Sequence, residues 1–345
     1  MCAARSTRQP ADPVVVDKFG GSVLRRPEDI AAAVAAVAEQ RGAGLRPVVV
    51  VSAFEGVTDA ILGSAAVLLP DRGAALRQPS HDAGSAFARE ADRALATGEA
   101  LSAALFAMGL QARGIPARSF SGAEAGIRTA AAHLGAEVRR VLPRRLREAL
   151  AEGLVPVVAG FQGIGTHGEL TTLGRGGTDL SAVVLAVALR AARCELFKDV
   201  GGVMEADPHL VPAARRLDLV DALQLELLAE QGAEVVHPVA VRRARRGRMP
   251  LLVRALDGDA PQTLVRAVRP RGSEAQGVLM LAVDRREGTA RVSVVGPAAM
   301  VPELLPVPAH GAGSFDEGGM RVVWAEVPLE QAGAAARAIH AGVMS

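Results

Sequence analysis

The chain has 345 residues, of which half are hydrophobic, and it carries a formal net charge of +2. This length allows two domains with sizeable cores, and so small a net charge gives no electrostatic footprint for nucleic acid. Two cysteines, Cys2 and Cys194, indicate neither a disulfide framework nor a metal site.

The first 250 residues alternate apolar runs with helical patterns. Buried strands are predicted at 13–19, 46–51, 153–159, 194–198 and 249–256. Helices are predicted at 27–40, 57–69, 98–114, 178–193, 220–233 and 238–247, and the polar segment from Asp71 to Thr97 is interpreted as a helical excursion. This alternation predicts an α/β protein, a three-layer αβα sandwich with a mainly parallel sheet.

The composition changes after about Leu256. Residues 257–276 are polar and rich in Pro and Gly, as in a linker. The last part predicts a small α+β module, with strands at 278–284, 290–296 and 320–327, a Pro/Gly-rich middle, and a helix at 329–342. No apolar run is long enough to span a membrane, and the first residues lack the apolar core of a signal peptide. A cytoplasmic protein without membrane contacts is therefore expected.

Glycine-rich segments follow the predicted strands, so we expect them at the edge where parallel sheets bind ligands. In "GRGGTD", Gly174 to Gly177 stand at the mouth of a helix, whose free N–H groups favour an anion. Arg175 adds a planar guanidinium group, whose paired N–H donors match the two oxygens of a carboxylate or phosphate. Lysine occurs only at Lys18 and Lys198, and both lie at the ends of strands predicted to reach this edge. The pattern indicates a site for several negative charges.

Each of these features also has a simpler interpretation. A glycine-rich loop before a helix can be a tight turn, and Asp179 can serve the helix dipole alone. Glu99 can merely follow an N-cap at Thr97. In a chain whose basic residues are nearly all arginine, the positions of the two lysines can be due to chance. Neither a Walker A loop nor the Rossmann fingerprint is present.

In combination, "VDKFGGS", "TTLGRGGTDLSA", "KDVGGVMEADP" and "GAEVVHP" resemble the aspartate kinases of the amino acid kinase family. The resemblance implies a catalytic domain at 13–256, a linker at 257–276 and a truncated ACT-like module at 277–345. It implies that ATP, with Mg²⁺ on its phosphates and no metal held by protein ligands alone, phosphorylates the side-chain carboxylate of L-aspartate to 4-phospho-L-aspartate. A homodimer is expected, whose tail dimerises or covers the sheet and whose incomplete module gives no lysine or threonine feedback.

The resemblance also implies a role for each site residue. The catalytic residues would be Lys18 and Asp179. The substrate would be bound by Ser52, Thr58, Glu99, Arg175 and Thr178. The nucleotide would be bound by Gly20, Gly21, Ser22, Lys198, Asp199, Gly202, Met204 and Asp207.

Four positions depart from the family pattern. Val23 replaces a hydroxyl residue, Met204 a tyrosine, His209 an arginine and Glu234 a lysine. These departures keep two other hypotheses open. One is a kinase for another amino acid or aspartate-like carboxylate in a specialised pathway. The other is a catalytically weak paralogue that serves as a regulatory subunit.

Overall fold

The computed structural model describes residues 12–68, 86–258, 260–267 and 278–344. Its largest sheet has eight strands, and all of its pairs are parallel except that between β13 and β14. The strand order is β12 (Leu219–Asp221), β14 (Gln262–Arg266), β13 (Leu251–Arg254), β9 (Arg193–Phe197), β1 (Val14–Phe19), β2 (Arg46–Val51), β6 (Val155–Ala159) and β3 (Ala117–Phe120).

Valine-rich strands form the centre of this sheet because both of its faces are covered. Alternate side chains of one strand point to opposite faces. Val48 and Val50 of β2 therefore pack in one apolar cluster, while Val49 and Val51 pack in another. All four are fully buried.

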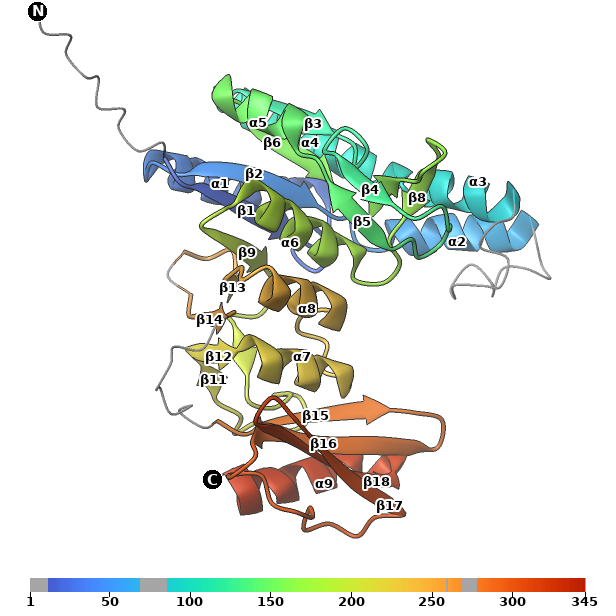
Figure 1. Cartoon of the computed structure of the whole chain (residues 1–345), viewed down its shortest axis with the longest axis vertical. Helices are drawn as coiled ribbons and strands as arrows, with labels where there is room; N and C mark the ends of the chain where they lie inside the picture. Colours follow the sequence, from blue (N-terminus) through green and yellow to red (C-terminus); the bar gives the residue numbers. More distant parts are fainter. Residues whose placement is uncertain (1–11, 69–85, 259, 268–277, 345) are drawn as a thin grey trace, which may run out of the picture.

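Helices lie on both faces of the sheet, which confirms the predicted three-layer αβα sandwich. The face with Val48 and Val50 is covered by α5 (Arg144–Ala151), α6 (Gly177–Leu189), α7 (Ala222–Glu230) and α8 (Pro238–Arg246). The last three lie in a row (Figure 1). The other face is covered by α1 (Ile30–Gly42) and α4 (Thr97–Ala112).

A small sheet that the sequence analysis does not predict lies beside the large one. Its order is β5 (Val138–Val141), β4 (Ile127–Thr129), β7 (Gln162–Ile164) and β8 (Leu170–Thr172). Helices α2 (Val57–Leu68) and α3 (Ala86–Leu95) lie next to it (Figure 1). A helical excursion was expected from Asp71 to Thr97. Within the described residues this segment contains α3, and residues 69–85 lie outside the described residues.

The C-terminal part forms an antiparallel sheet at one end of the molecule (Figure 1). The order is β15 (Met280–Arg285), β16 (Thr289–Pro297), β18 (Met320–Pro328) and β17 (Gly311–Glu317), and α9 (Ala332–Ile339) packs on it. The α+β module is thus confirmed, but its middle contains β17, which the analysis missed. Because β17 is a largely exposed edge strand, it lacks the apolar alternation of a buried one.

Part of the expected linker belongs to the large sheet. Residues 262–266 form β14, which pairs with β13 and β12. Upstream, β10 (Val203–Met204) and β11 (Arg216–Leu217) form a two-stranded ribbon.

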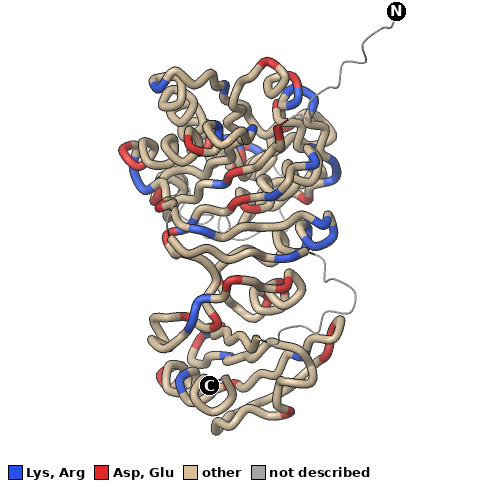
Figure 2. The backbone as a smooth tube through the Cα atoms, turned by 90° about the vertical axis from the view of Figure 1, so that its left-hand side faces the viewer, with Lys and Arg blue, Asp and Glu red and all other residues tan. Residues whose placement is uncertain are grey.

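Charges of both signs alternate over the molecule, and neither sign gathers on one part of it in the view of Figure 2. No helix in the described ranges is long and apolar enough to cross a bilayer.

Candidate active site

A cavity of about 630 Å³ opens at the carboxyl ends of the central strands. The structure brings to its walls every residue predicted to be catalytic or substrate-binding, namely Lys18, Ser52, Thr58, Glu99, Arg175, Thr178 and Asp179. The remaining wall is largely apolar and includes Leu62, Leu95, Leu134 and Phe161. The cavity therefore offers charged groups for a polar ligand beside an apolar wall.

Two ammonium groups share one carboxylate at the floor of the site. Lys18 Nζ lies 2.6 Å from Asp179 Oδ1, and both side chains are 7% exposed. Lys198 Nζ lies 3.4 Å from Asp179 Oδ2. Burial alone would raise the pKa of Asp179, but Lys18 and Lys198 outweigh it and lower that pKa to about 2. The cluster is one positive charge in excess, which suits the binding of an anion.

The backbone explains how these side chains meet. Lys18 lies near the end of β1, between β2 and β9, and Asp179 lies in the first turn of α6. The loop before α6 turns back sharply at Gly176, whose φ is +68°. A Cβ at Gly176 would lie 2.2 Å from the ring of His237. Only glycine fits there, so this "GRGG" residue is required by a close approach as well as by its backbone angle.

Glu99 lies on α4 with one oxygen available. Its Oε1 accepts a hydrogen bond from the Ala53 amide at 3.2 Å, whereas Oε2 is buried without a hydrogen-bond partner. Burial raises the pKa of Glu99 to about 7. The N-cap of α4 is Ala96, not Thr97, so the interpretation of Glu99 as a residue that merely follows a cap is wrong. A buried carboxylate that faces a cavity calls for a cationic ligand.

Arg175 and the hydroxyl residues complete the polar wall. Arg175 is exposed in the loop between β8 and α6. Ser52 directly follows β2, Thr58 lies in the first turn of α2, and Thr178 lies in the first turn of α6. These residues come from two stretches of the chain, 52–58 and 175–178, which converge only in the fold.

The predicted nucleotide residues lie on two neighbouring segments, and none of the eight lines the described cavity. Gly20, Gly21 and Ser22 follow β1, where a Cβ at Gly20 would lie 2.6 Å from Lys18 Nζ. The other five lie between β9 and residue 207. Among them, Lys198 reaches the cavity floor through its contact with Asp179. Burial, followed by the charge of Lys18, lowers the pKa of Lys198.

The four departures from the family pattern occupy different surroundings. Val23 is buried in the apolar cluster beneath α1 and α4. Met204 is half-buried in β10, whereas His209 and Glu234 are exposed. The charge of Glu234 is therefore screened by solvent.

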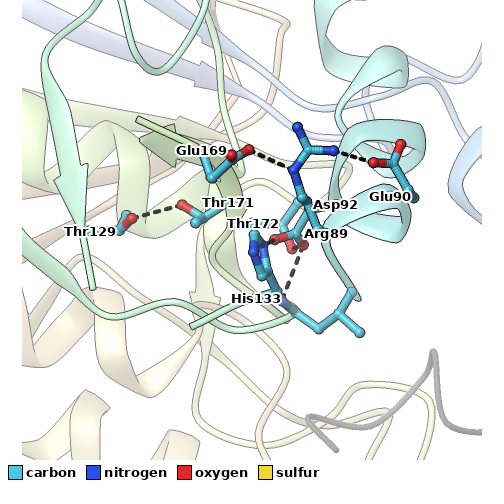
Figure 3. Close-up of polar contacts among 9 residues, drawn as sticks. Arg89, Glu90, Asp92, Thr129, His133, Glu169, Thr171 and Thr172 are labelled. Atoms are coloured by element: carbon cyan, nitrogen blue, oxygen red, sulfur yellow. Dashed lines mark hydrogen bonds and ion pairs between the residues drawn. The ribbon is translucent and has the colours of Figure 1, made fainter. Parts of the chain in front are cut away.

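Two polar groups near the cavity were not predicted from the sequence. His237 packs against Gly176, and burial, together with nearby Arg175, lowers its pKa, although Asp179 opposes the shift. Asp92 is fully buried and joins His133 to Thr172, as Figure 3 shows. The motif "GAEVVHP" contains His237 and could have indicated it, but the partners of Asp92 are 41 and 80 residues away in sequence.

Comparison with known proteins assigns the chain to a family. Residues 13–255 match the amino acid kinase family. The aspartokinase of Mycolicibacterium smegmatis is 39% identical over 304 residues, covering 88% of this chain and 67% of that protein. The aspartokinase of Thermus thermophilus is 39% identical over 283 residues, covering 82% of this chain and 65% of that protein. The chain thus spans about two thirds of the length of these relatives.

Solved structures of aspartokinases share the fold of this chain. E. coli aspartokinase III in complex with aspartate and ADP superposes with a TM-score of 0.77 at 21% identity, covering 96% of this chain and all of that one. Aspartate kinase from Synechocystis gives a TM-score of 0.63 at 32% identity, covering 95% of this chain and 55% of that one. The resemblance drawn from the motifs is confirmed. The chain belongs to the amino acid kinase family, and its sequence relatives there are aspartokinases.

Proposed function

We propose that the chain is an aspartate kinase, which transfers the γ-phosphoryl group of ATP to the side-chain carboxylate of L-aspartate and forms 4-phospho-L-aspartate and ADP. The observation that supports this most is the shared cavity. A two-lysine, one-aspartate cluster lies at its floor, and Glu99 and Arg175 line its walls. These groups complement a phosphoryl group, an ammonium and a carboxylate, respectively.

The reaction needs charge stabilisation more than proton transfer. The attacking carboxylate is already ionised at neutral pH, so one P–O bond forms and the bond to ADP breaks without a general base. Lys18 would stabilise the transferred phosphoryl group, and Asp179 would hold Lys18 in place. Arg175 would bind the α-carboxylate, Glu99 the ammonium, and Ser52, Thr58 and Thr178 would complete the substrate pocket.

The remaining residues would hold the nucleotide. Gly20, Gly21 and Ser22 offer backbone donors beside Lys18, while Lys198 supplies a second ammonium. Asp199, Gly202, Met204 and Asp207 would line the nucleotide on the segment after β9. Mg²⁺ would neutralise phosphate charge when bound. Among the described residues, no group of three or more His, Cys, Asp or Glu side chains could hold a metal ion. Mg²⁺ would be bound through the phosphates of ATP.

The organisation of the chain is part of the proposal. Residues 13–256 would form the catalytic domain, with β14 added to its sheet, and residues 257–276 would connect it to an ACT-like module at 277–345. No helix lies between residues 298 and 310, where the strands of that module are joined by an irregular segment. This supports an enzyme without lysine or threonine feedback. A homodimer in the cytoplasm completes the proposal.

Hydroxamate formation tests the function directly. An acyl phosphate reacts with hydroxylamine, so purified protein with ATP and Mg²⁺ should yield aspartyl hydroxamate. A panel should include L-aspartate, L-glutamate and N-acetyl-L-aspartate, the last lacking the ammonium that Glu99 would bind. Product with L-glutamate but not with L-aspartate would favour the second hypothesis. No product with any acid would favour the regulatory paralogue.

A further inference from the structure

Leu134 has an unusual backbone conformation for a large side chain. It lies in the bend between β4 and β5 with φ at +56°, a left-handed conformation that glycine adopts readily and leucine does not. In the described part of the chain, three other non-glycine residues have positive φ. Arg190 is the C-cap of α6 and Arg248 comes after Gly247, the C-cap of α8, so both lie at helix ends, where such angles are common. The third, Phe161, lies between β6 and β7. Leu134 follows no helix, so its conformation needs another cause.

Hydrogen bonds to Asp92 stabilise this conformation. Its Oδ1 accepts the Leu134 amide at 3.1 Å and the Thr172 hydroxyl at 2.5 Å. Its Oδ2 pairs with His133 Nδ1 at 2.7 Å (Figure 3). In addition, the amides of Gly135 and Ala136 donate to the Thr172 carbonyl. A strained residue persists where its surroundings over-determine it, and here they fix the residues on both sides of Leu134.

The result is a bulky side chain in the wall of the proposed amino-acid pocket. Leu134 lines the cavity and packs with Leu95 in a small apolar cluster. Thr172, the other end of the Asp92 network, lines the same cavity. A glycine at 134 would keep the backbone without strain and leave this part of the wall open. The leucine therefore narrows the cavity on the apolar side.

We propose that Leu134 is a specificity-determining residue, and that Asp92 is the positioning residue that holds it. The side chain of Leu134 sterically excludes acids with one carbon more than L-aspartate, at the end or on the β-carbon. This inference rests on the proposed function. It concerns which acids the same pocket accepts as substrates.

The test compares L-aspartate with L-glutamate and threo-3-methyl-L-aspartate, each one carbon larger. The wild-type protein and Leu134→Gly are assayed at saturating ATP, and amino-acid binding is measured in parallel by calorimetry. One methylene in an apolar pocket is worth about 10–200-fold in discrimination. In Leu134→Gly, we expect the kcat/KM ratio for L-aspartate over at least one larger acid to fall about tenfold or more, with the KM for ATP unchanged.

Arg190→Gly is the matched control, because it replaces another left-handed residue, at the end of α6 and outside the cavity lining. It should leave both ratios as in the wild type. Unchanged ratios in a folded Leu134→Gly variant would overturn the inference while the kinase activity stands. A wild type that neither binds nor phosphorylates any of the three acids would instead overturn the proposed function, and this inference with it.

A second variant tests the role of Asp92. Asp92→Asn should also relax the selectivity, and in Asp92→Asn/Leu134→Gly the effects should not add, because Asp92 acts through Leu134. Additive effects would show that Asp92 serves the pocket in another way and would remove it from the proposal.

Discussion

At the scale of single residues, the site depends on an imbalance of charge. Two ammonium groups contact one carboxylate in a buried setting. The carboxylate compensates one of them, and the other remains for an incoming anion. The strongly lowered pKa of Asp179 shows how firmly its ionised form is held. A phosphoryl group in transfer would supply the missing negative charge.

Replacement of Lys18 tests this directly. In Lys18→Ala, we expect kcat to fall about 10²–10³-fold, since the ammonium stabilises charge that develops in the transition state. The fold should survive, although Asp179 would retain only Lys198 as a partner. Turnover measured beside the circular dichroism spectrum separates loss of catalysis from unfolding. Near wild-type turnover would remove Lys18 from the catalytic role.

Glu99 predicts a dependence on pH. Burial raises its pKa to about 7, and only its ionised form attracts the substrate ammonium. The kcat/KM for L-aspartate reports the free enzyme, so it should rise with pH through about 7 and fall about tenfold per unit well below it. Glu99→Gln should have a lower kcat/KM at pH 8 and lack this step. A step near pH 7 that persists in Glu99→Gln would belong to another group.

At the scale of elements, the N-terminus of α6 positions Arg175, Thr178 and Asp179 together. Its loop is fixed by Gly176, where left-handed backbone and the ring of His237 leave no room for a side chain. In Gly176→Ala, we expect the loop to shift, with a rise in the KM for L-aspartate and a loss of stability of about 1–3 kcal/mol. Gly168→Ala is the control, since Gly168 has a similar φ of +82° but open space around it. Equal effects on KM in both variants would contradict the role of the His237 contact.

The sequence predicts an element well when its pattern is local, and poorly when the element depends on contacts between residues that are distant in sequence. Strands such as β1 and β2 are continuous apolar runs, so they could be identified locally. Strands β7 and β8 have three residues each, and β17 is an exposed edge strand without apolar alternation. The seven cavity-lining residues assigned to catalysis or substrate binding lie in short motifs, so the sequence could indicate them. Asp92 and Leu134 were not predicted, because a buried hydrogen-bond network between distant segments leaves no local pattern.

At the scale of the whole molecule, the C-terminal module contacts the proposed nucleotide segment. Glu205 follows β10, is 1% exposed and lies between Met204 and Asp207. Its Oε1 lies 2.9 Å from His340 Nε2, beyond α9, and its carbonyl accepts the Leu281 amide of β15. Burial opposes ionisation of Glu205, but His340 and then Arg215 outweigh it and lower its pKa. From the sequence, the tail was expected to dimerise or to cover the sheet. A contact with the proposed nucleotide segment was not part of that expectation.

The contact between His340 and Glu205 predicts an effect of the module on the nucleotide alone. In His340→Ala, the buried Glu205 loses one of its partners, which typically costs about 1.5–3 kcal/mol for a hydrogen bond to a charged group. The segment that carries Met204 and Asp207 should loosen, so we expect the KM for ATP to rise several-fold while the KM for L-aspartate stays the same. His340→Gln should restore much of the ATP affinity, because its amide can donate from nearly the position of Nε2. His310→Ala, at an exposed position beside β17, is the matched control. If His340→Ala raised both KM values equally, or if His310→Ala had the same effect, the module would act through general stability and not through Glu205.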